Sequence, residues 1–396
     1  MILEYIYANG VRKIIELEHT VEVNEQWEYI QTTNKLEFIN SFIPKFMSKQ
    51  KIVLFDTNHK QLLDFYNNNN INEFEGIEEV NKEAQILFFT SGSSGFPVGA
   101  FKTRENLLLE VKSLQKIIQT RQIKKVVVSV PFVHIYGVLA GLLLPLTLKN
   151  VTLVIKEDFL PYELLQEAQD ENVVVITTPV FIKALSKLPL EQDLSKTLFI
   201  SSTAPLSNED IISFQKSYSS DIIQLFGSTE TGGIAYKEGA SNVWQPLESV
   251  EIGTFDDKLN VCSPFISPYL VNSKIINLKQ PYQTEDIVEI KGKTFILLGR
   301  SNKLIKIAGK RFSATQIENI LEEIPEVNKA IVELVYKKEL LRSEQIVITL
   351  EASKQIDKRI VKEKISEYYG IITIPFRLKF VEKINYSAMG KKVIFK

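Results

Sequence analysis

Short apolar runs alternate with amphipathic stretches between residues 36 and 225 of this chain. The runs consist mainly of Val, Ile, Leu and Phe, as in parallel strands that are covered on both faces. The stretches between them repeat apolar residues at helical spacing. This alternation predicts an α/β fold with largely parallel strands. The expected strands are Lys51–Phe55, Ala84–Thr90, Lys125–Val130, Val151–Lys156, Val173–Thr177, Thr197–Ser201 and Ile222–Leu225, and the expected helices are Leu36–Met47, Arg104–Gln119, Glu163–Glu171, Val180–Lys187 and Ser207–Lys216.

The pattern changes after about Ser241, where short strands are separated by turn residues and predict an antiparallel sheet or a small barrel. Beyond the basic stretch Gly299–Lys303, helices and strands mix again over a length that suits an independent domain. We therefore expect a large domain over residues 1–299 and a small α+β domain over residues 300–396. The later elements are expected at Val250–Ile252, Lys258–Val261, Asp286–Lys291, Thr294–Leu298, Ser313–Glu323, Ala330–Val335, Gln345–Leu350, Ile356–Tyr368 and Phe376–Phe380.

Composition narrows the class of protein. Lys and Arg total 47 against 48 for Asp and Glu, so the formal net charge of −1 gives no field for gathering nucleic acid or anionic lipid. The longest apolar stretch, Val138–Leu148, is much shorter than the roughly 20 residues that span a bilayer. The single cysteine, Cys262, cannot form an internal disulfide, which fits a reducing compartment. We expect a cytoplasmic protein without a membrane span.

The segment with the strongest chemical signal follows the expected strand Ala84–Thr90. It is a loop of small and hydroxylated residues, namely Thr90, Ser91, Gly92, Ser93, Ser94 and Gly95. Glycines let backbone N–H groups approach an anion, and hydroxyls add further donors, so the loop predicts phosphate binding. The plain alternative is a Ser/Gly surface turn before a helix from about Arg104. The loop is neither a Walker A loop nor a nucleophile elbow, because it lacks Gly-Lys-Ser/Thr and Gly-x-Ser-x-Gly.

This loop resembles the phosphate-binding signature of the adenylate-forming superfamily, which includes acyl-CoA synthetases, adenylation domains and luciferases. The resemblance implies a large domain with parallel-rich sheets and a small antiparallel subdomain, followed by a small mobile α+β domain. Val98 stands where the family usually has lysine, and Lys102 is a candidate to compensate for it. The likeness extends over roughly residues 80–396, so the outer N-terminal subdomain is expected to be shortened and the acid site more open or smaller.

Two further segments resemble walls of the family's acyl and adenine pockets. Around Pro131–Gly137 the resemblance assigns Phe132, His134 and Tyr136 to the acid pocket, together with Gly232 and Gly233 further on. Taken alone, His134 would more often be a core histidine. The second segment contains Ser202, Ala204 and Pro205, which by composition is only a turn before a helix.

The segment Gln224–Gly233 resembles the family's Tyr-Gly-x-Thr-Glu motif, with Phe226 in place of tyrosine and followed by Gly227 and Ser228. We expect a strand end and then a compact polar loop, which suits ligand binding at the carboxyl edge of a parallel sheet. The resemblance implies that Thr229 contacts phosphates and that Glu230 holds Mg²⁺, a cation that prefers oxygen ligands. Without the companion motifs, Glu230 would be an exposed loop acid.

Three segments of the C-terminal part complete the likeness. Asp286, in Tyr282–Asp286, is expected to accept hydrogen bonds from both ribose hydroxyls, and Glu285 replaces a glycine and could demand a different turn. In the segment Gly299–Arg311, the resemblance assigns Arg300 to ribose and phosphate, Asn302 to the hinge pivot, and Lys306 and Arg311 to the second half-reaction. A solvated basic surface is the plain alternative there.

Lys391 matches the family's lysine that bridges the carboxylate and the α-phosphate, whereas a terminal Gly-Lys by itself is an ordinary frayed tail. The resemblance thus implies an enzyme that uses ATP and Mg²⁺ to convert a small carboxylic acid, aryl or short acyl, into an acyl-adenylate. The acyl group would pass to coenzyme A, or to the phosphopantetheine of an acyl carrier protein. The other hypotheses are a P-loop kinase or ATPase, which would need a Walker lysine, and a non-catalytic adenylate-binding homologue. The oligomeric state is left open.

Overall fold

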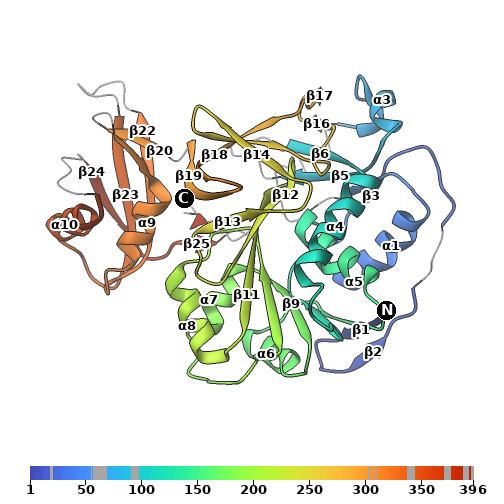
Figure 1. Cartoon of the computed structure of the whole chain (residues 1–396), viewed down its shortest axis with the longest axis horizontal. Helices are drawn as coiled ribbons and strands as arrows, with labels where there is room; N and C mark the ends of the chain where they lie inside the picture. The colour runs from blue at the N-terminus through green and yellow to red at the C-terminus, as the bar shows by residue number, and fades with distance from the viewer. Residues whose placement is uncertain are drawn as a thin grey trace. The chain divides into compact units, whose positions relative to one another are not determined.

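The computed structural model describes residues 1–17, 21–54, 56, 69–90, 98–301, 304–307, 310–336, 344–369, 376–386 and 392–393 (Figure 1). The chain forms two compact units, each with its own internal contacts. The first comprises residues 1–252 and 261–282, and the second comprises residues 253–260 and 283–396. The domain boundary expected between residues 299 and 300 stays a prediction.

The main sheet of the first unit has the strand order β13-β12-β11-β10-β9-β7-β8-β1-β2. All neighbours from β11 to β1 are parallel, whereas β2, β12 and β13 are antiparallel additions at the two edges. The expected parallel strands are thus confirmed. Their bounds are β1 Ile2–Ile6, β2 Arg12–Ile14, β7 Lys125–Val128, β8 Thr152–Lys156, β9 Val173–Thr177, β10 Thr197–Ser201, β11 Asp221–Ser228, β12 Gly232–Glu238 and β13 Val243–Pro246.

Helices cover both faces of this sheet (Figure 1). Successive side chains of a strand point to opposite faces, so Val127 packs with α6–α8 while Val126 and Val128 pack with α1, α4 and η2. Because both faces are covered, the strands are apolar throughout. The helices are α6 Pro161–Ala168, α7 Pro179–Leu185, α8 Asn208–Tyr218, α1 Lys35–Met47, α4 Arg104–Ile118, the π-helix η2 Gly137–Leu143 and α5 Leu144–Thr147.

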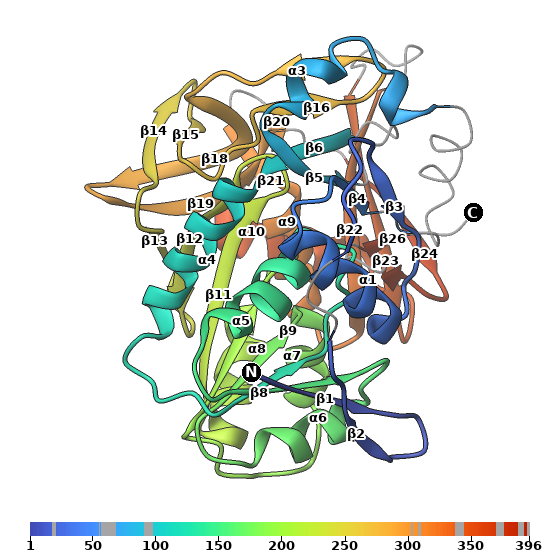
Figure 2. The same ribbon diagram turned by 90° about the vertical axis from the view of Figure 1, so that its right-hand side faces the viewer.

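A second sheet, with the order β17-β16-β6-β5-β4-β3, packs on the outer side of α1 and α4 (Figure 2). Ile86 and Phe88 of β5 face these helices, whereas Leu87 and Phe89 face a smaller core that includes α3 and the short helix η1. The elements are β3 Glu28–Ile30, β4 Ile52–Leu54, β5 Ala84–Thr90, β6 Val98–Thr103, β16 Tyr269–Val271, β17 Ile275–Asn277, η1 Ile71–Glu73 and α3 Ile77–Asn81.

Strand β6 was not among the strands expected from the sequence. Helix α4 does begin at Arg104, but Val98–Thr103 first returns antiparallel to β5. The segment lacks an alternating pattern because it is buried on both faces and because one of its buried residues is a lysine.

The second unit contains short antiparallel hairpins and a compact α+β core. In the three-stranded sheet β22-β23-β24 the first pair is antiparallel and the second parallel, and α9 and α10 pack on it. The expected α+β segment is therefore confirmed. The bounds are β18 Tyr282–Lys291, β19 Thr294–Arg300, β20 Leu304–Ile307, β21 Lys310–Ser313, α9 Ala314–Glu322, β22 Val327–Tyr336, β23 Glu344–Ala352, α10 Lys358–Tyr369, β24 Phe376–Val381, β25 Asn385–Tyr386 and β26 Lys392–Val393. Strands β14 Glu251–Phe255 and β15 Lys258–Cys262 run across the boundary between the units.

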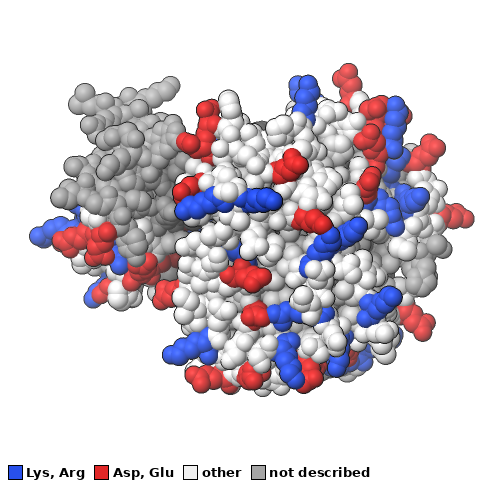
Figure 3. Space-filling view, viewed as in Figure 1, with Lys and Arg blue, Asp and Glu red and all other residues white. Residues whose placement is uncertain are grey.

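The surface carries charges of both signs. Lys and Arg side chains are interspersed with Asp and Glu on the face shown in Figure 3. Within the described residues, no helix is long and apolar enough to cross a membrane, and the apolar stretch Val138–Leu148 is folded into η2 and α5.

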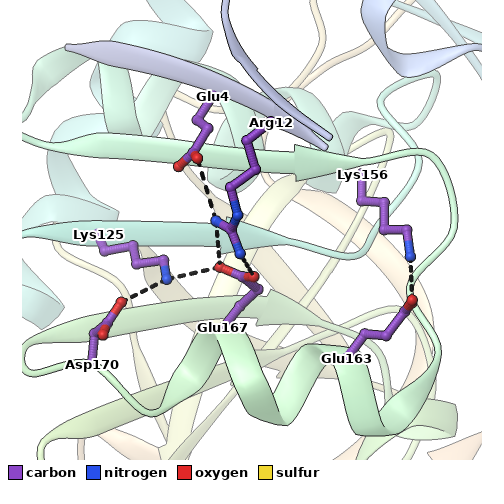
Figure 4. A network of polar contacts seen from close by, with 7 residues as sticks. All are labelled: Glu4, Arg12, Lys125, Lys156, Glu163, Glu167 and Asp170. Atoms are coloured by element: carbon purple, nitrogen blue, oxygen red, sulfur yellow. Dashed lines mark hydrogen bonds and ion pairs between the residues drawn. The ribbon is translucent and has the colours of Figure 1, made fainter. Parts of the chain in front are cut away.

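A buried carboxylate on α6 links the edge strand β2 to the inner strand β7 of the main sheet (Figure 4). Glu167 of α6 accepts hydrogen bonds from the Arg12 guanidinium of β2, and it forms an ion pair with Lys125 of β7 at 2.8 Å. Burial alone would raise the pKa of Glu167, but the hydrogen bonds from Arg12 and Lys125 outweigh it and hold that pKa below its usual value.

Replacing Glu167 with alanine is expected to lower the free energy of unfolding by about 1–3 kcal/mol, since two cations lose their shared acceptor. A depressed folded-state pKa stabilises the fold above the unfolded pKa, and this contribution is lost as the pH falls through the folded-state value. The free energy of unfolding measured in urea should therefore be lower for Glu167→Gln than for wild type at neutral pH. This difference should shrink in acid. Glu171→Gln is the control, because Glu171 pairs with Lys196 in solvent. Equal losses of unfolding free energy in Glu167→Gln and Glu171→Gln would contradict the stabilising role assigned to the buried Glu167 carboxylate.

Candidate functional site

The motif around Glu230 forms the turn of a β-hairpin. Strand β11 runs through Gly227 to Ser228, past its expected end, and β12 starts at Gly232. The expected polar loop is thus reduced to three residues, 229–231, which corrects its length. A β-bulge at Phe226/Gly227 brings the strands together, and a Cβ on Gly227 would lie 2.3 Å from the Gly232 carbonyl oxygen. Glycine is needed there because the two backbones approach so closely.

Hydrogen bonds fix the backbone of this turn. The Ser228 and Thr231 hydroxyls lie 3.0 Å apart, and each accepts from the backbone N–H of the other residue. From a neighbouring segment, the Ser267 N–H donates to the Glu230 carbonyl at 2.9 Å, and its hydroxyl donates to the Thr229 carbonyl at 3.5 Å. The turn therefore holds Thr229 and Glu230, both half-buried, in a set position at the carboxyl end of β11. Sequence reasoning missed Thr231 and Ser267.

Lys102 does not have the role that the sequence suggested for it. Its side chain is 0% exposed, and its ammonium donates to the carbonyls of Phe265 at 2.5 Å and Glu230 at 3.3 Å. Burial lowers the pKa of Lys102. The negative charges of Glu110 and Glu230 raise this pKa, but they offset only part of the effect of burial. The expectation that Lys102 compensates for the lysine missing at position 98 is therefore wrong, since its ammonium is buried and donates to the Phe265 and Glu230 carbonyls.

Gly232 and Gly233 lie against the carboxylate of Glu110 on α4. The Gly233 N–H donates to Glu110 Oε1 at 2.7 Å. Gly232 has a left-handed φ of +71°, and a Cβ there would lie 2.5 Å from Glu110 Oε2 and 2.8 Å from the Phe265 Cβ. The side of Gly232 that would carry a side chain is thus filled by Glu110 and Phe265. The assignment of the two glycines to the acid pocket stays a prediction.

The segment after β10 lies beside the same sheet edge. The Ser202 hydroxyl donates to the Leu225 carbonyl of β11 at 3.1 Å, so the end of β10 is tied to β11. Thr203 has a φ of +83°, which is strained for a β-branched residue. In the segment that connects β10 to α8, Ala204 is half-buried and Pro205 is exposed. Because β10 and β11 are parallel, this segment and the Glu230 turn leave the sheet at the same edge, where α/β proteins bind ligands.

The aromatic residues assigned to the acid pocket are buried. Phe132 is 2% exposed and lies 5.9 Å from Phe38, ring centre to ring centre. The Tyr136 hydroxyl lies 2.7 Å from the Ile200 carbonyl and 3.2 Å from the Thr177 carbonyl, and burial raises the pKa of Tyr136. Their contacts are those of the core, and His134 is half-buried. Their part in binding an acid stays a prediction.

In the second unit, Asp286 and Arg300 face each other across the β18–β19 hairpin. Arg300 Nε lies 3.5 Å from Asp286 Oδ1, and the Asp286 side chain is 15% exposed. Glu285 lies within continuous β18 and forms an ion pair with Lys258 at 2.9 Å, so the expected change of turn is wrong: an extended strand residue needs no special φ. The hairpin thus presents an acceptor beside a cation, a pairing suited to ribose and phosphate.

Several expected site residues lie outside the described residues, or are described only in their backbone. Of the phosphate loop, Thr90 ends β5, whereas Ser91, Gly92, Ser93, Ser94 and Gly95 fall outside, as do Asn302 and Lys391. Lys306 and Arg311 are register partners in the β20–β21 hairpin.

Magnesium fits Glu230 by its ligand chemistry. Among the described residues no group of three or more His, Cys, Asp or Glu could hold a metal ion, so an all-protein cage is not found there. Mg²⁺ commonly binds through one or two carboxylates, with substrate phosphates and waters filling the other positions. A single half-buried carboxylate on a fixed turn meets that requirement.

Known proteins share both the sequence pattern and the fold. Residues 24–263, more than half of the chain, match the AMP-binding enzyme family. A 4-coumarate–CoA ligase of Cereibacter sphaeroides is 25% identical over 312 residues, which cover 78% of this chain and 70% of that protein. The Staphylococcus aureus protein named "Putative long chain fatty acid-CoA ligase VraA" is 24% identical over 331 residues, covering 76% and 68%.

Among solved structures, the O-succinylbenzoate coenzyme A synthetase MenE from Bacillus subtilis, in complex with ATP and magnesium ion, superimposes with a TM-score of 0.77. The identity is 16%, with 93% of this chain and 88% of that chain covered, so this likeness shows a shared fold. The sequence match over residues 24–263 carries the assignment further: this chain belongs to the AMP-binding enzyme family, within the adenylate-forming superfamily.

Proposed function

We propose that this protein activates a small carboxylic acid with ATP as an acyl-adenylate, releases pyrophosphate, and then transfers the acyl group to coenzyme A. The observation that carries the proposal is the Thr229–Glu230 turn, whose backbone is held in place at the carboxyl edge of the parallel sheet and which carries a hydroxyl and a carboxylate. Family membership and the Asp286–Arg300 pair support it.

In the first step, a carboxylate oxygen of the acid attacks the α-phosphorus, and the bond to the bridging oxygen of pyrophosphate breaks. Two anions must meet, so the site has to neutralise charge before the new bond forms. Thr229 and the backbone of residues 90–95 would donate to phosphate oxygens, and Lys391 would bridge the carboxylate and the α-phosphate. Mg²⁺ on Glu230 would supply charge neutralisation for the phosphates. Asp286 would accept from the ribose hydroxyls, with Arg300 beside it.

In the second step, a thiol attacks the acyl carbon of the mixed anhydride and AMP leaves. We assign Lys306 and Arg311 to this step, with Asn302 as the pivot between the two steps and the break between domains at residues 299/300. The relatives with a named CoA ligase activity support coenzyme A as the acceptor. A carrier-protein phosphopantetheine would use the same adenylation site.

We favour an aryl or short acyl acid. The names 4-coumarate–CoA ligase and O-succinylbenzoate coenzyme A synthetase support an aryl acid, and the fatty acid name of the third relative requires that longer chains be tested as well. The pocket assignments Phe132, His134, Tyr136, Gly232 and Gly233 belong to this proposal.

The decisive experiment offers purified protein a panel of aryl, short, medium and long-chain acids with ATP and Mg²⁺, and measures AMP and pyrophosphate. Acid-dependent release of both is expected, followed by thioester when coenzyme A is added. If a thioester forms with holo-carrier protein but not with coenzyme A, the acceptor is the phosphopantetheine of the carrier protein. Release of ADP would indicate a kinase or ATPase, and nucleotide binding without pyrophosphate release would indicate a non-catalytic homologue.

A further inference from the structure

We propose that Lys102 and Glu110 are positioning residues that set the Glu230 turn for Mg²⁺–nucleotide binding, by holding its backbone from two sides. This proposal rests on the proposed function, in which Glu230 is the metal ligand. Neither residue belongs to the motifs that resemble the family's signatures. Both lie in the segment just after the phosphate loop, Lys102 on β6 and Glu110 on α4.

Lys102 joins the turn to the segment that supports it. Its ammonium donates to the carbonyl of Glu230 at 3.3 Å and to the carbonyl of Phe265 at 2.5 Å. Two residues after Phe265, the Ser267 N–H donates to the same Glu230 carbonyl at 2.9 Å. The Glu230 carbonyl thus accepts two hydrogen bonds, one of them charge-assisted, and cannot rotate without breaking both.

Glu110 holds the other end of the turn. Its Oε1 accepts from the Gly233 N–H at 2.7 Å, and Oε2 lies in the space that a Cβ on Gly232 would occupy. Oε2 is buried and has no hydrogen-bond partner in the part of the chain that the structure describes. A carboxylate with one oxygen unsatisfied is costly to bury, so this side chain is poorly explained by core stability alone.

The donor and acceptor capacities of the two side chains match what the turn requires. An ammonium offers only donors and takes the Glu230 carbonyl, whereas a carboxylate offers only acceptors and takes the Gly233 N–H. The side chains are 0% and 4% exposed, respectively, and the opposite charges offset part of each other's burial cost. Together they fix the two ends of a four-residue span, Glu230–Gly233, whose first residue is the proposed metal ligand.

The test compares Lys102→Met and Glu110→Met, which remove the donor to the Glu230 carbonyl and the acceptor for the Gly233 N–H respectively, with wild type in Mg²⁺ titrations. Mg²⁺-dependent ATP binding is measured by calorimetry, and acid-dependent pyrophosphate exchange is measured at saturating ATP. Loss of a residue that orients a metal ligand is expected to raise the half-saturating Mg²⁺ concentration roughly ten- to a hundred-fold. Gly232→Ala displaces the Glu110 carboxylate without removing a charge. It is expected to raise the half-saturating Mg²⁺ concentration as well.

The control is Glu167→Gln, which alters a buried, cation-paired carboxylate of α6 outside this site and should leave the Mg²⁺ titration unchanged. If a single variant fails to fold, the double variant Lys102→Met/Glu110→Met removes both charges at similar volume and is expected to fold. Folded single or double variants that keep the wild-type Mg²⁺ half-saturation would overturn the proposal. Wild-type protein that binds Mg²⁺–ATP but releases no pyrophosphate with any acid would instead overturn the proposed function and leave the binding comparison intact.

Discussion

Lys391→Ala is expected to abolish acid-dependent pyrophosphate exchange while largely sparing thioester formation from supplied acyl-adenylate. The Lys391 ammonium is assigned to bridge the substrate carboxylate and the α-phosphate. Its removal therefore takes away charge stabilisation that is needed in the first step only. Loss of one preorganised electrostatic donor costs about 10²–10³-fold in rate. Exchange of labelled pyrophosphate into ATP measures the first step, and release of AMP from supplied adenylate with coenzyme A measures the second.

The matched control for this prediction is Lys383→Ala, which removes an exposed lysine of the same unit. It should leave both half-reactions unchanged. Full exchange activity in Lys391→Ala would refute the role of that residue, and a parallel loss of both half-reactions would show that the substitution acts on folding or on nucleotide binding in general.

Glu230→Gln is expected to lower turnover by about 10²-fold and to raise the Mg²⁺ requirement, because an amide oxygen carries no charge for the metal. The backbone of the turn should persist, since the Ser267 and Lys102 hydrogen bonds reach the Glu230 carbonyl and not its side chain. Thermal unfolding should accordingly stay near that of wild type. A Mg²⁺ titration of pyrophosphate exchange checks the prediction.

Glu238→Gln, at the exposed end of β12, is the control because it removes a carboxylate from the same hairpin. Unchanged Mg²⁺ dependence in Glu230→Gln would remove this residue from the metal site. Comparing Glu230→Gln with Lys102→Met also separates two causes of weak metal binding: loss of the ligand itself and loss of its position.

The elements that the sequence predicted well are those whose signal is local. Strands β5, β9 and β10 have the expected bounds, because a largely apolar run flanked by polar residues has few other ways to be buried. Helix α8 begins next to its expected start, because the Ser207 hydroxyl caps it by accepting from the Asp210 N–H at 3.1 Å. The phosphate, Glu230 and Asp286 motifs were recognised by their resemblance to the superfamily's signatures, which are short and local.

The elements that were missed depend on partners far along the chain. The buried ammonium of Lys102 has carbonyl partners 128 and 163 residues away, and no local pattern reveals that this lysine will be buried. For the same reason, no sequence pattern connects Glu110 with Gly233, which is 123 residues distant. The carbonyls that hold the Tyr136 hydroxyl, in β9 and β10, are likewise distant along the chain, and the part of Tyr136 in binding an acid stays a prediction.

By itself, then, the sequence determined the α/β class, the order of the motifs and the superfamily, because apolar periodicity and short ligand-binding signatures are local properties. Only the tertiary structure decided which charged residues are buried, how short the Glu230 turn is, and what holds it. Those features follow from hydrogen bonds between distant backbone and side-chain groups, whose free energy depends on burial that exists only once the chain has folded.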